Sequence, residues 1–420
     1  MLQIYKIFLN YVLFKRKFVT LHHQMNQKMK RLLLGLIMTV SQTMVCNAQV
    51  IDTVLNKTSN KPFNFSVAIP DGNYRVTVIL GNKKKAGQTV VRAESRRHYV
   101  DMVTTKKGEF ETVSFIVNKH SPIIKDDVRV KLKPREVDYK NWDDSLNLSF
   151  CGLNPAIQRI KIEPIMDVIT VFLCGNSTVV DQENEPWASW GQMITRWFEP
   201  QVAIANFAES GLSCTSFLAQ LRLDKILSQL KKGDFVIVEF GHNDEKEKKA
   251  GDGAWYSYSR NLKIFVDRVK EAGGNIIFCT PTARRSFDNN GHIINTHGDY
   301  PAAMKAVAAR ENVPVIDLTQ MSTTFYEALG VEGSKKSLVH YPANTFPNQD
   351  KPLADNTHFN PYGAWEVAKM VVMGLKQIHS PLADYLRPEW QDFNPARPDD
   401  PDAFVWQMSS GSNLTKPDGN

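Results

Sequence analysis

Four short polar blocks in the second half of the chain hold the residue types that acyl transfer uses. They contain Ser177, Gly211, Asn243 and, late in the chain, Asp355 with His358. A serine hydroxyl becomes a good nucleophile only when a base removes its proton, and His358 is a suitable base. Asp355, three residues before it, can accept a hydrogen bond from the other ring nitrogen and fix the tautomer. The set predicts nucleophilic catalysis with Ser177 as the attacking group.

A tetrahedral intermediate also needs hydrogen-bond donors for its oxyanion. The candidates are the backbone N–H groups of Ser177 and Gly211 and the side-chain amide of Asn243. Taken singly, each residue has an ordinary structural explanation, as a turn, loop or capping residue. Their joint occurrence, each after a predicted strand or before a predicted helix, is what favours catalysis.

The elements that must position these blocks alternate between strand and helix. Apolar runs predict strands at Val168 to Cys174, Val202 to Phe207, Phe235 to Phe240, Asn275 to Cys279 and Val313 to Leu318. Helical spacing is found in two sets, Leu262, Phe265, Val266 and Val269, and Trp365, Ala368, Val372 and Leu375. This order predicts an α/β fold, a three-layer, doubly wound, parallel five-stranded sheet of flavodoxin-like type. Such sheets bind ligands at the carboxyl ends of their strands, where the first three blocks lie.

The first half of the chain has a different texture, with short alternating segments and no helical pattern. The predicted strands are Phe63 to Ile69, Tyr74 to Leu80, Thr89 to Glu94, Phe110 to Val117, Val128 to Leu132, Leu146 to Phe150 and Ile157 to Ile162. They predict a β-sandwich of jelly-roll type over residues 49–166. This unit could bind carbohydrate through aromatics such as Trp142 and Tyr99, or serve as a structural brace with those rings as core filler.

The amino terminus has the form of a secretory signal. Lys30 and Arg31 precede an apolar segment that ends near Ala48, so residues 1–48 are expected to be a leader, with translation starting at Met29. We therefore expect a secreted protein, periplasmic, extracellular or at the cell surface, with no integral membrane segment after cleavage. The hydrolase region is expected over 167–380, followed by a Pro- and Asp-rich tail over 381–420.

The net charge and the cysteine content indicate which classes of ligand and partner to expect. The leader holds seven of the 51 Lys and Arg and none of the acids, which leaves 44 basic and 44 acidic groups. A nearly neutral protein gives no electrostatic reason to expect nucleic-acid binding. Cys151, Cys174, Cys214 and Cys279 remain, and their spacing favours buried free thiols over disulfides. No Cys/His cluster has zinc-like spacing, so neither a metal nor another cofactor is predicted.

The four blocks resemble those of the SGNH hydrolases, with Ser177, Gly211, Asn243 and His358 at the four named positions. The resemblance covers roughly Val168 to His379. Within that superfamily, the strings GNSTVVDQ, WASWGQM, HYPANTFPNQ and DNTHFNPYGA are similar to rhamnogalacturonan acetylesterases. The resemblance implies a metal-independent esterase that removes acetyl groups from pectin, and an amino-terminal galactose-binding-like sandwich, which some of those proteins carry.

One residue departs from the family pattern, which usually has Asp between the Gly and Ser of the first block. Here the residue is Asn176, which is nearly isosteric with Asp but lacks its negative charge. The geometry should survive, with a shift in pH dependence or rate. Two alternatives stay open: an acetylesterase acting on xylan or other acetylated sugars, and a carbohydrate-binding protein with a degenerate hydrolase domain.

Substrate contacts are predicted from residue type and position. Trp187 and Trp190 follow the nucleophile turn, and Tyr341 lies with Phe346 in the long loop before Asp355, where aromatic faces could stack on sugar rings. Basic residues that could pair with uronate carboxylates are Arg284, Arg285, Lys335 and Lys336, with solvated surface charge as the alternative.

Overall fold

The computed structural model describes residues 49–409 and residue 416. The predicted leader therefore lies outside the described residues. Those from Gln49 onward form one compact unit. No described helix is both long enough and apolar enough to span a bilayer.

A five-stranded parallel sheet is the central layer of the second half, as predicted. Its order is β12-β11-β13-β14-β15, so β12 and β15 are the edge strands and β11 (Ile169–Gly175), β13 (Phe235–Glu239) and β14 are interior. The other strands are β12 (Val202–Asn206), β14 (Asn275–Cys279) and β15 (Val315–Ile316). β15 is shorter than the predicted run, and all five strands lie near their predicted positions.

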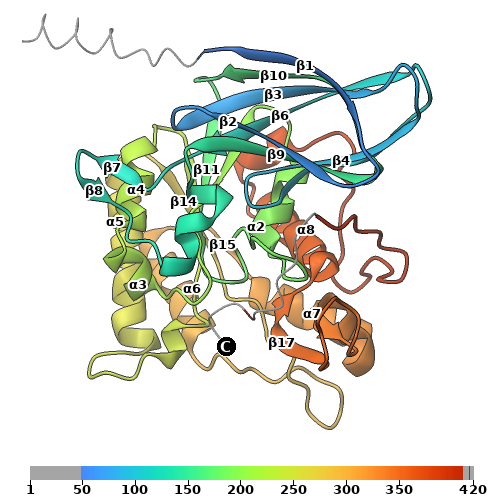
Figure 1. Ribbon diagram of the computed structural model, residues 1–420. Coiled ribbons are helices and arrows are strands. Elements are labelled where there is room, and N and C mark those ends of the chain that lie inside the picture. The colour runs from blue at the N-terminus through green and yellow to red at the C-terminus, as the bar shows by residue number, and fades with distance from the viewer. Residues whose placement is uncertain (1–48, 410–415, 417–420) are drawn as a thin grey trace, which may run out of the picture. The chain divides into compact units, whose positions relative to one another are not determined.

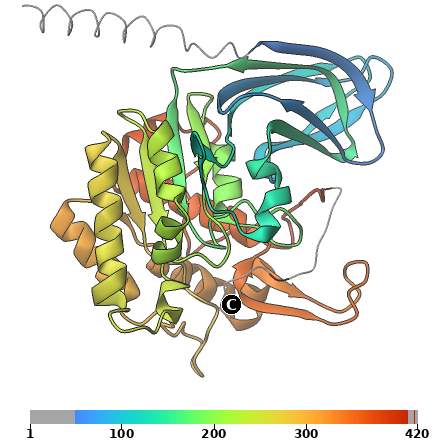
Figure 2. The ribbon, with the colours of Figure 1, turned by 60° about the vertical axis from the view of Figure 1, so that its left-hand side comes forward.

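Both faces of this sheet are covered, which explains why its strands read as continuous apolar runs. Alternate residues of β11 enter two different hydrophobic clusters, with Val171 and Leu173 in one and Phe172 and Cys174 in the other. The helices that complete the layers are α3 (Cys214–Ala219), α4 (Arg222–Gln229), α5 (Ser259–Glu271), α6 (Tyr300–Glu311), α7 (Leu318–Gly333) and α8 (Pro361–Gln377). Figures 1 and 2 show them on the two sides of the sheet.

The first half forms two four-stranded antiparallel sheets, one lying over the other (Figures 1 and 2). The first has the order β1-β10-β3-β6, with bounds Ile51–Thr58, Ala156–Pro164, Gly72–Gly81 and Phe110–Lys119. The second has the order β2-β9-β4-β5, with bounds Phe63–Ala68, Ser145–Asn154, Gly87–Ala93 and Arg97–Thr105.

Three details of the first half differ from the sequence prediction. Strands β1 and β5 were not predicted, because β1 is half exposed and polar and β5 holds several charged residues. The run Val128 to Leu132 is a strand only at Val128–Arg129, where it pairs as β8 with the short strand β7 (Ile123–Lys125).

The two aromatic rings suggested as sugar platforms in the first half are buried. Tyr99 is 3% exposed and stacks on Phe115, and Trp142 is 4% exposed and packs edge-on against Phe207 in the second half of the chain. They are core and interface residues, so the binding interpretation of these two residues is wrong. The four cysteines among the described residues are buried and free, as predicted.

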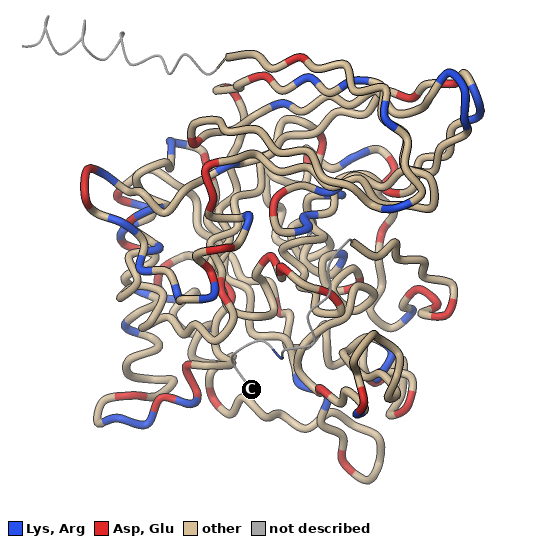
Figure 3. Tube along the Cα trace, in the orientation of Figure 1, with Lys and Arg blue, Asp and Glu red and all other residues tan. Residues whose placement is uncertain are grey.

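The tail after α8 packs along the surface as far as it is described. Phe393 is buried, and Phe404 and Trp406 lie against the cluster that contains the α8 side chains. Lys369 of α8 holds the Asp399 carboxylate at 2.6 Å. Figure 3 shows acidic and basic positions interspersed along the described trace, in agreement with its nearly balanced charge.

Candidate active site

Ser177 lies in a tight turn at the carboxyl end of β11. The N–H groups of Val179 and Val180 both donate to the Asn176 carbonyl at 3.0 Å, which closes the turn. The Ser177 carbonyl accepts from the Ser189 hydroxyl at 2.7 Å. Gly175 is required before the turn, because a Cβ there would lie 2.4 Å from the Val179 side chain. The backbone around Ser177 is thus fixed from both sides.

Asn176 is fully buried beneath this turn. Its Oδ1 accepts from the N–H and the hydroxyl of Thr178, at 3.1 and 3.0 Å. Its Nδ2 has no hydrogen-bond partner among the described residues. The Thr178 hydroxyl also lies 2.9 Å from Glu239 Oε1, at the end of β13. Burial raises the pKa of Glu239 to about 7, although hydrogen bonds from Trp190 and Thr178 oppose the rise.

His358 and Asp355 form a buried pair on β17 (Leu353–Phe359), just before α8. The His358 Nδ1 lies 2.8 Å from Asp355 Oδ2, and Asp355 Oδ1 accepts from the backbone N–H groups of Thr357 and His358. Burial alone would raise the pKa of Asp355, but the hydrogen bonds from the His358 ring and from the backbone N–H groups of His358 and Thr357 hold it well below its usual range. Since a carboxylate can only accept, Nδ1 carries the proton and Nε2 has the lone pair.

Two contacts bring this pair to the nucleophile turn. The chain after the turn forms an antiparallel bridge between Ala188 and Phe359, next to His358. Trp187 packs edge-on against the His358 ring, with 5.8 Å between ring centroids. The first and last blocks are about 180 residues apart in the sequence. They therefore meet at the carboxyl ends of the parallel strands.

The second and third blocks also lie at the carboxyl ends of the parallel strands. Gly211 has φ of +79°, a left-handed conformation that favours glycine, in the loop after β12. The Gln182 side chain bridges the Ser177 carbonyl and the Ser210 hydroxyl, at 3.1 and 3.3 Å. Asn243, after β13, donates to the Leu212 carbonyl at 3.0 Å. Hydrogen bonds thus connect the first block to the second and the second block to the third.

Comparison with known proteins identifies the family to which this chain belongs. Residues 167–365 match the model of the GDSL-like Lipase/Acylhydrolase family. The chain is 41% identical over 220 residues to rhamnogalacturonan acetylesterase RhgT of Bacillus subtilis (strain 168), covering 52% of this chain and 94% of that protein. It is 32% identical over 219 residues to the probable rhamnogalacturonan acetylesterase YesY of the same organism, covering 51% and 95%.

The chain belongs to the GDSL-like lipase/acylhydrolase family. It is a carboxylic ester hydrolase. A third relative, the uncharacterized esterase YxiM of Bacillus subtilis (strain 168), is 25% identical over 324 residues, covering 76% of this chain and 75% of that protein. In the part of this family member that the structure describes, no group of three or more His, Cys, Asp or Glu is placed to hold a metal ion.

The aromatic residues predicted to touch substrate have different positions in this GDSL-like hydrolase. Trp187 lies against His358, as described, and is 3% exposed. Trp190 is fully buried in the core and donates its indole N–H to Glu239 at 2.5 Å, so its prediction as a sugar contact is wrong. Tyr341 is partly exposed and packs edge-on against Phe346, with 5.0 Å between ring centroids.

The predicted basic residues all have partners within the chain. Arg284 pairs with Glu245 at 2.5 Å, and Lys335 and Lys336 pair with Glu332 and Asp402. Arg285 donates to the Ser334 hydroxyl and the Asn356 side chain. These contacts favour the alternative, in which the four side chains serve as ordinary structural and surface charges.

Three arginines that sequence analysis did not single out hold the loop after the nucleophile. They lie at the β4–β5 turn of the first half. Arg97 pairs with Asp181 at 2.5 Å, with both side chains fully buried. Arg96 donates to the Gln182 and Trp187 carbonyls at 3.0 and 2.9 Å. Arg92 pairs with the buried Glu185 at 3.4 Å. The string RAESRR at 92–97, dense in charge within a strand region, was the signal that could have marked them.

Proposed function

We propose that the protein is a secreted serine esterase that removes acetyl groups from plant cell-wall polysaccharide, in the first place pectin rhamnogalacturonan. The observation that carries the proposal is the buried His358–Asp355 pair, tied to the Ser177 turn through Trp187 and the bridge at Phe359. The substrate class is suggested by the names of two relatives that align over nearly their full length.

The first half of the reaction forms an acetyl-enzyme. Ser177 Oγ attacks the acetyl carbonyl carbon while His358 Nε2 takes the hydroxyl proton, and Asp355 stabilises the resulting imidazolium. When the tetrahedral intermediate collapses, the bond to the sugar oxygen breaks. The imidazolium returns its proton to that oxygen, and the sugar leaves as an alcohol.

The oxyanion that develops in this step is assigned to three donors, the backbone N–H groups of Ser177 and Gly211 and the Asn243 amide. One N–H of Asn243 donates to the Leu212 carbonyl and fixes the amide plane, and the second N–H is the one assigned to the oxyanion. Loss of one such donor costs a factor of about 10² to 10³ in rate.

The second half of the reaction releases acetate. Water attacks the acetyl-enzyme and gives a proton to His358 Nε2, and the Ser177 oxygen leaves and takes that proton back. No residue other than those already named is needed, and no metal is required for either step.

The test compares acetate release by the wild-type protein and by Ser177→Ala and His358→Ala. Each variant should lose activity on an activated acetyl ester by a factor on the order of 10⁴ or more. The matched control is His292→Ala, because the His292 side chain is 71% exposed and lies away from the four blocks. Equal rates for wild type and Ser177→Ala would refute the mechanism.

The same assay on natural polymers tests the substrate. Acetylated rhamnogalacturonan should be deacetylated faster than acetylated xylan, and the reverse order would move the assignment to xylan. Binding to acetylated pectin without acetate release, unchanged in Asn176→Asp, would instead indicate a binding protein with a degenerate site.

Two further parts of the proposal concern the first half of the chain. We propose that residues 1–48 direct export and are removed after Ala48, which predicts a mature protein that begins at Gln49. Mass spectrometry of the exported protein checks this boundary. We also propose that the two antiparallel sheets are a jelly-roll sandwich of galactose-binding-like type, a proposal supported by their strand order.

A further inference from the structure

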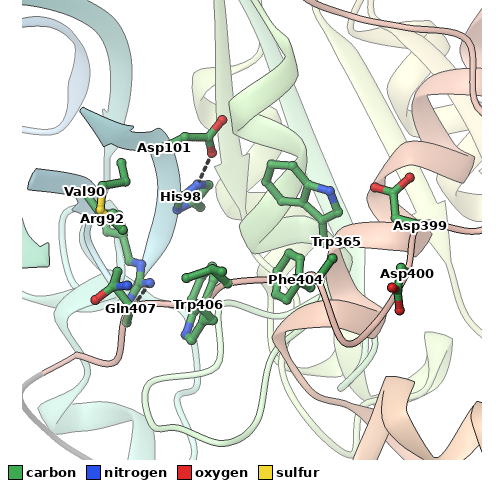
Figure 4. Close-up of a pocket in the computed structure, with 13 residues that line it drawn as sticks. Val90, Arg92, His98, Asp101, Trp365, Asp399, Asp400, Phe404, Trp406 and Gln407 are labelled. Carbon is green, nitrogen blue, oxygen red and sulfur yellow. Dashed lines mark hydrogen bonds and ion pairs between the residues drawn. The ribbon is translucent and has the colours of Figure 1, made fainter. Parts of the chain in front are cut away.

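One cavity of the described structure is lined by none of the residues of the four catalytic blocks. It has a volume of about 550 Å³ and is bounded by β4 and β5 of the first half, α8, and residues 399–407 of the tail (Figure 4). We call it the aromatic cavity. Its volume is within the range of cavities that hold small molecules, which combine apolar walls with a few placed polar groups.

Three aromatic rings form its apolar wall. They are Trp365 of α8 and Phe404 and Trp406 of the tail, all partly exposed (Figure 4). Trp406 is held in place, because the Arg92 guanidinium covers its ring at 3.7 Å and its indole N–H donates to Glu185 at 2.8 Å. Fixed aromatic faces provide a large contact area at little cost in side-chain entropy.

His98 of β5 supplies a buried acceptor beside these rings. Its Nε2 lies 2.8 Å from Asp101 Oδ1, so Nε2 carries the proton and Nδ1 has a lone pair. Burial holds the pKa of His98 below its ordinary value despite Asp101, so the ring is neutral near pH 7. The residue is 4% exposed, and Nδ1 has no hydrogen-bond partner among the described residues. A purely apolar ligand would leave this acceptor unsatisfied.

The charges around the cavity disfavour an anionic ligand. Asp399 and Asp400 lie at the end away from His98 and are exposed to solvent (Figure 4). The nearby cations are already paired, Arg92 with Glu185, Arg196 with Asp101 and Lys369 with Asp399. Carboxylates accept hydrogen bonds from hydroxyl groups, and they repel a uronate.

We propose that the aromatic cavity is a carbohydrate-binding site for a neutral sugar residue of a polysaccharide, separate from the active site. A sugar ring presents C–H groups on its face, which pack on Trp365 and Trp406, and hydroxyl groups on its edge. One hydroxyl donates to His98 Nδ1, and others donate to Asp399 or Asp400. The site takes no part in ester cleavage, and it anchors the protein to a polymer near its acetylated stretches.

Affinity electrophoresis at pH 7 tests this binding with the Ser177→Ala protein, which cannot deacetylate the gel polymer under the proposed mechanism. The probes are three neutral polymers, galactan, arabinan and xylan, and one anionic polymer, polygalacturonate. At least one neutral polymer should retard the protein more strongly than polygalacturonate. Adding Trp365→Ala or Trp406→Ala should weaken that retardation about tenfold or more.

Two controls keep the outcome interpretable. Trp255→Ala removes an indole that is 52% exposed and does not line this cavity, and it should bind as the parent does. Trp365→Phe keeps an aromatic face and should retain most of the retardation, which separates loss of binding from misfolding. In an otherwise wild-type protein, Trp365→Ala should leave the rate on a small activated acetyl ester unchanged.

The proposal is overturned if no neutral polymer retards the protein, or if both alanine variants bind as the parent does. It is also overturned if polygalacturonate is the preferred polymer. Because binding is measured without catalysis, a failure of the proposed esterase activity would leave these results unaffected, and the two failures are distinguishable.

Discussion

Asn176 and Glu239 are joined through a single hydroxyl group beneath the nucleophile turn. Thr178 Oγ1 has one proton to share between Asn176 Oδ1 and Glu239 Oε1, at 3.0 and 2.9 Å. An Asp at position 176 would place a second carboxylate near the buried Glu239. The neutral amide avoids that repulsion, and its cost is a buried Nδ2 without a partner among the described residues.

Asn176→Asp should therefore destabilise the protein more at high pH than at low pH. The new carboxylate oxygen would be buried where no described donor reaches it, so its folded pKa lies above the unfolded value of about 3.9. The group then lowers stability progressively as the pH rises above the unfolded value. We expect a loss of about 2 kcal/mol at pH 8 and a smaller loss at pH 5, measured by urea unfolding.

The exposed Asn289 provides the matched control, because Asn289→Asp adds the same charge in solvent. It should change the free energy of unfolding by less than about 0.5 kcal/mol at either pH. Equal stabilities of Asn176→Asp and wild type at pH 8 would contradict this account.

At the residue scale, the sequence pattern indicates the members of the candidate site more clearly than the side chains that pack around them. Ser177, Gly211, Asn243 and His358 could be chosen because each follows a predicted strand or precedes a predicted helix. The sequence could not show that Trp190 is a core residue and Trp187 a neighbour of His358. Both follow the nucleophile turn, and that position does not determine which ring faces the core. The Asp355 contact followed from its three-residue spacing to His358, which is a local feature.

At the scale of elements, the β4–β5 turn acts as a support for the loop that follows Ser177. Its arginines reach four points of that loop, at Asp181, the Gln182 carbonyl, Glu185 and the Trp187 carbonyl. The loop in turn carries Trp187 to His358. The first half of the chain therefore helps to hold the active-site loop in place through these arginine contacts.

Arg97→Met should destabilise the protein strongly, because it leaves the Asp181 carboxylate buried without its cation. Removing one member of a buried ion pair costs about 3 to 5 kcal/mol. The measurement is the free energy of unfolding in urea, together with the rate on an activated acetyl ester, which should fall as the loop loses its support.

The exposed pair of Arg159 and Asp52 on the first sheet provides the comparison, with side chains 46% and 33% exposed. Arg159→Met should cost less than about 1 kcal/mol and leave the rate unchanged. The double variant Arg97→Met/Asp181→Leu should recover much of the lost stability, because it removes both charges. A cost for Arg97→Met no larger than that for Arg159→Met would disprove the supporting role.

The sequence did not predict these element contacts, for a physical reason. Arg97 and Asp181 are 84 residues apart, and each lies in a segment with ordinary local patterning. Periodicity reports whether a segment is half buried or fully buried, but it does not say which cation meets which carboxylate. Strand β5 was missed because its first three residues, Arg97, His98 and Tyr99, are all buried, so the strand lacks the alternation of polar and apolar residues that marks a half-buried strand.

At the scale of the whole molecule, several buried carboxylates hold their protons more tightly in the folded state. Burial raises the pKa of Glu94 to about 8 and those of Glu239 and Asp244 to about 7. An unfolded carboxyl group loses its proton near pH 4. From about pH 4 to about pH 8 the folded protein therefore keeps protons that the unfolded chain has lost, so stability falls as the pH rises, and above pH 7.5 Glu94 is the main carboxyl contributor.

We expect the melting temperature to fall between pH 7.5 and 9. Histidines that are neutral when buried oppose this trend only near and below pH 6.5, where the unfolded chain gains protons. The buried thiols act in the same direction as the carboxylates, because burial raises their pKa values above the unfolded value. Calorimetry at a series of pH values measures the slope.

Glu94→Gln should reduce that slope, since Glu94 has the highest of these carboxyl pKa values and its Oε1 accepts from the Asn147 backbone N–H, which an amide oxygen can also do. The exposed Glu332 provides the control, and Glu332→Gln should leave the slope unchanged. A melting temperature that stays constant or rises from pH 7.5 to 9 would contradict the expected sign.

The overall architecture was largely predictable, because a parallel sheet buried on both faces leaves apolar runs that the sequence displays directly. The five strands were predicted from these runs, and the α5 and α8 helices were predicted from the helical spacing of their apolar residues. The aromatic cavity was not, because its walls come from β4, β5, α8 and the tail, and only the fold brings these four segments together.

The arginines of the β4–β5 turn also limit the order in which the chain can fold. Arg92 donates to the Ser409 hydroxyl at 2.8 Å, a contact that spans 317 residues, and it meets Glu185 across 93 residues. During synthesis these cations emerge long before their partners, so the two antiparallel sheets cannot complete their packing until almost the whole chain is available. Closing such long loops slows folding and delays it until after synthesis, which is compatible with the proposed export of the chain before it folds.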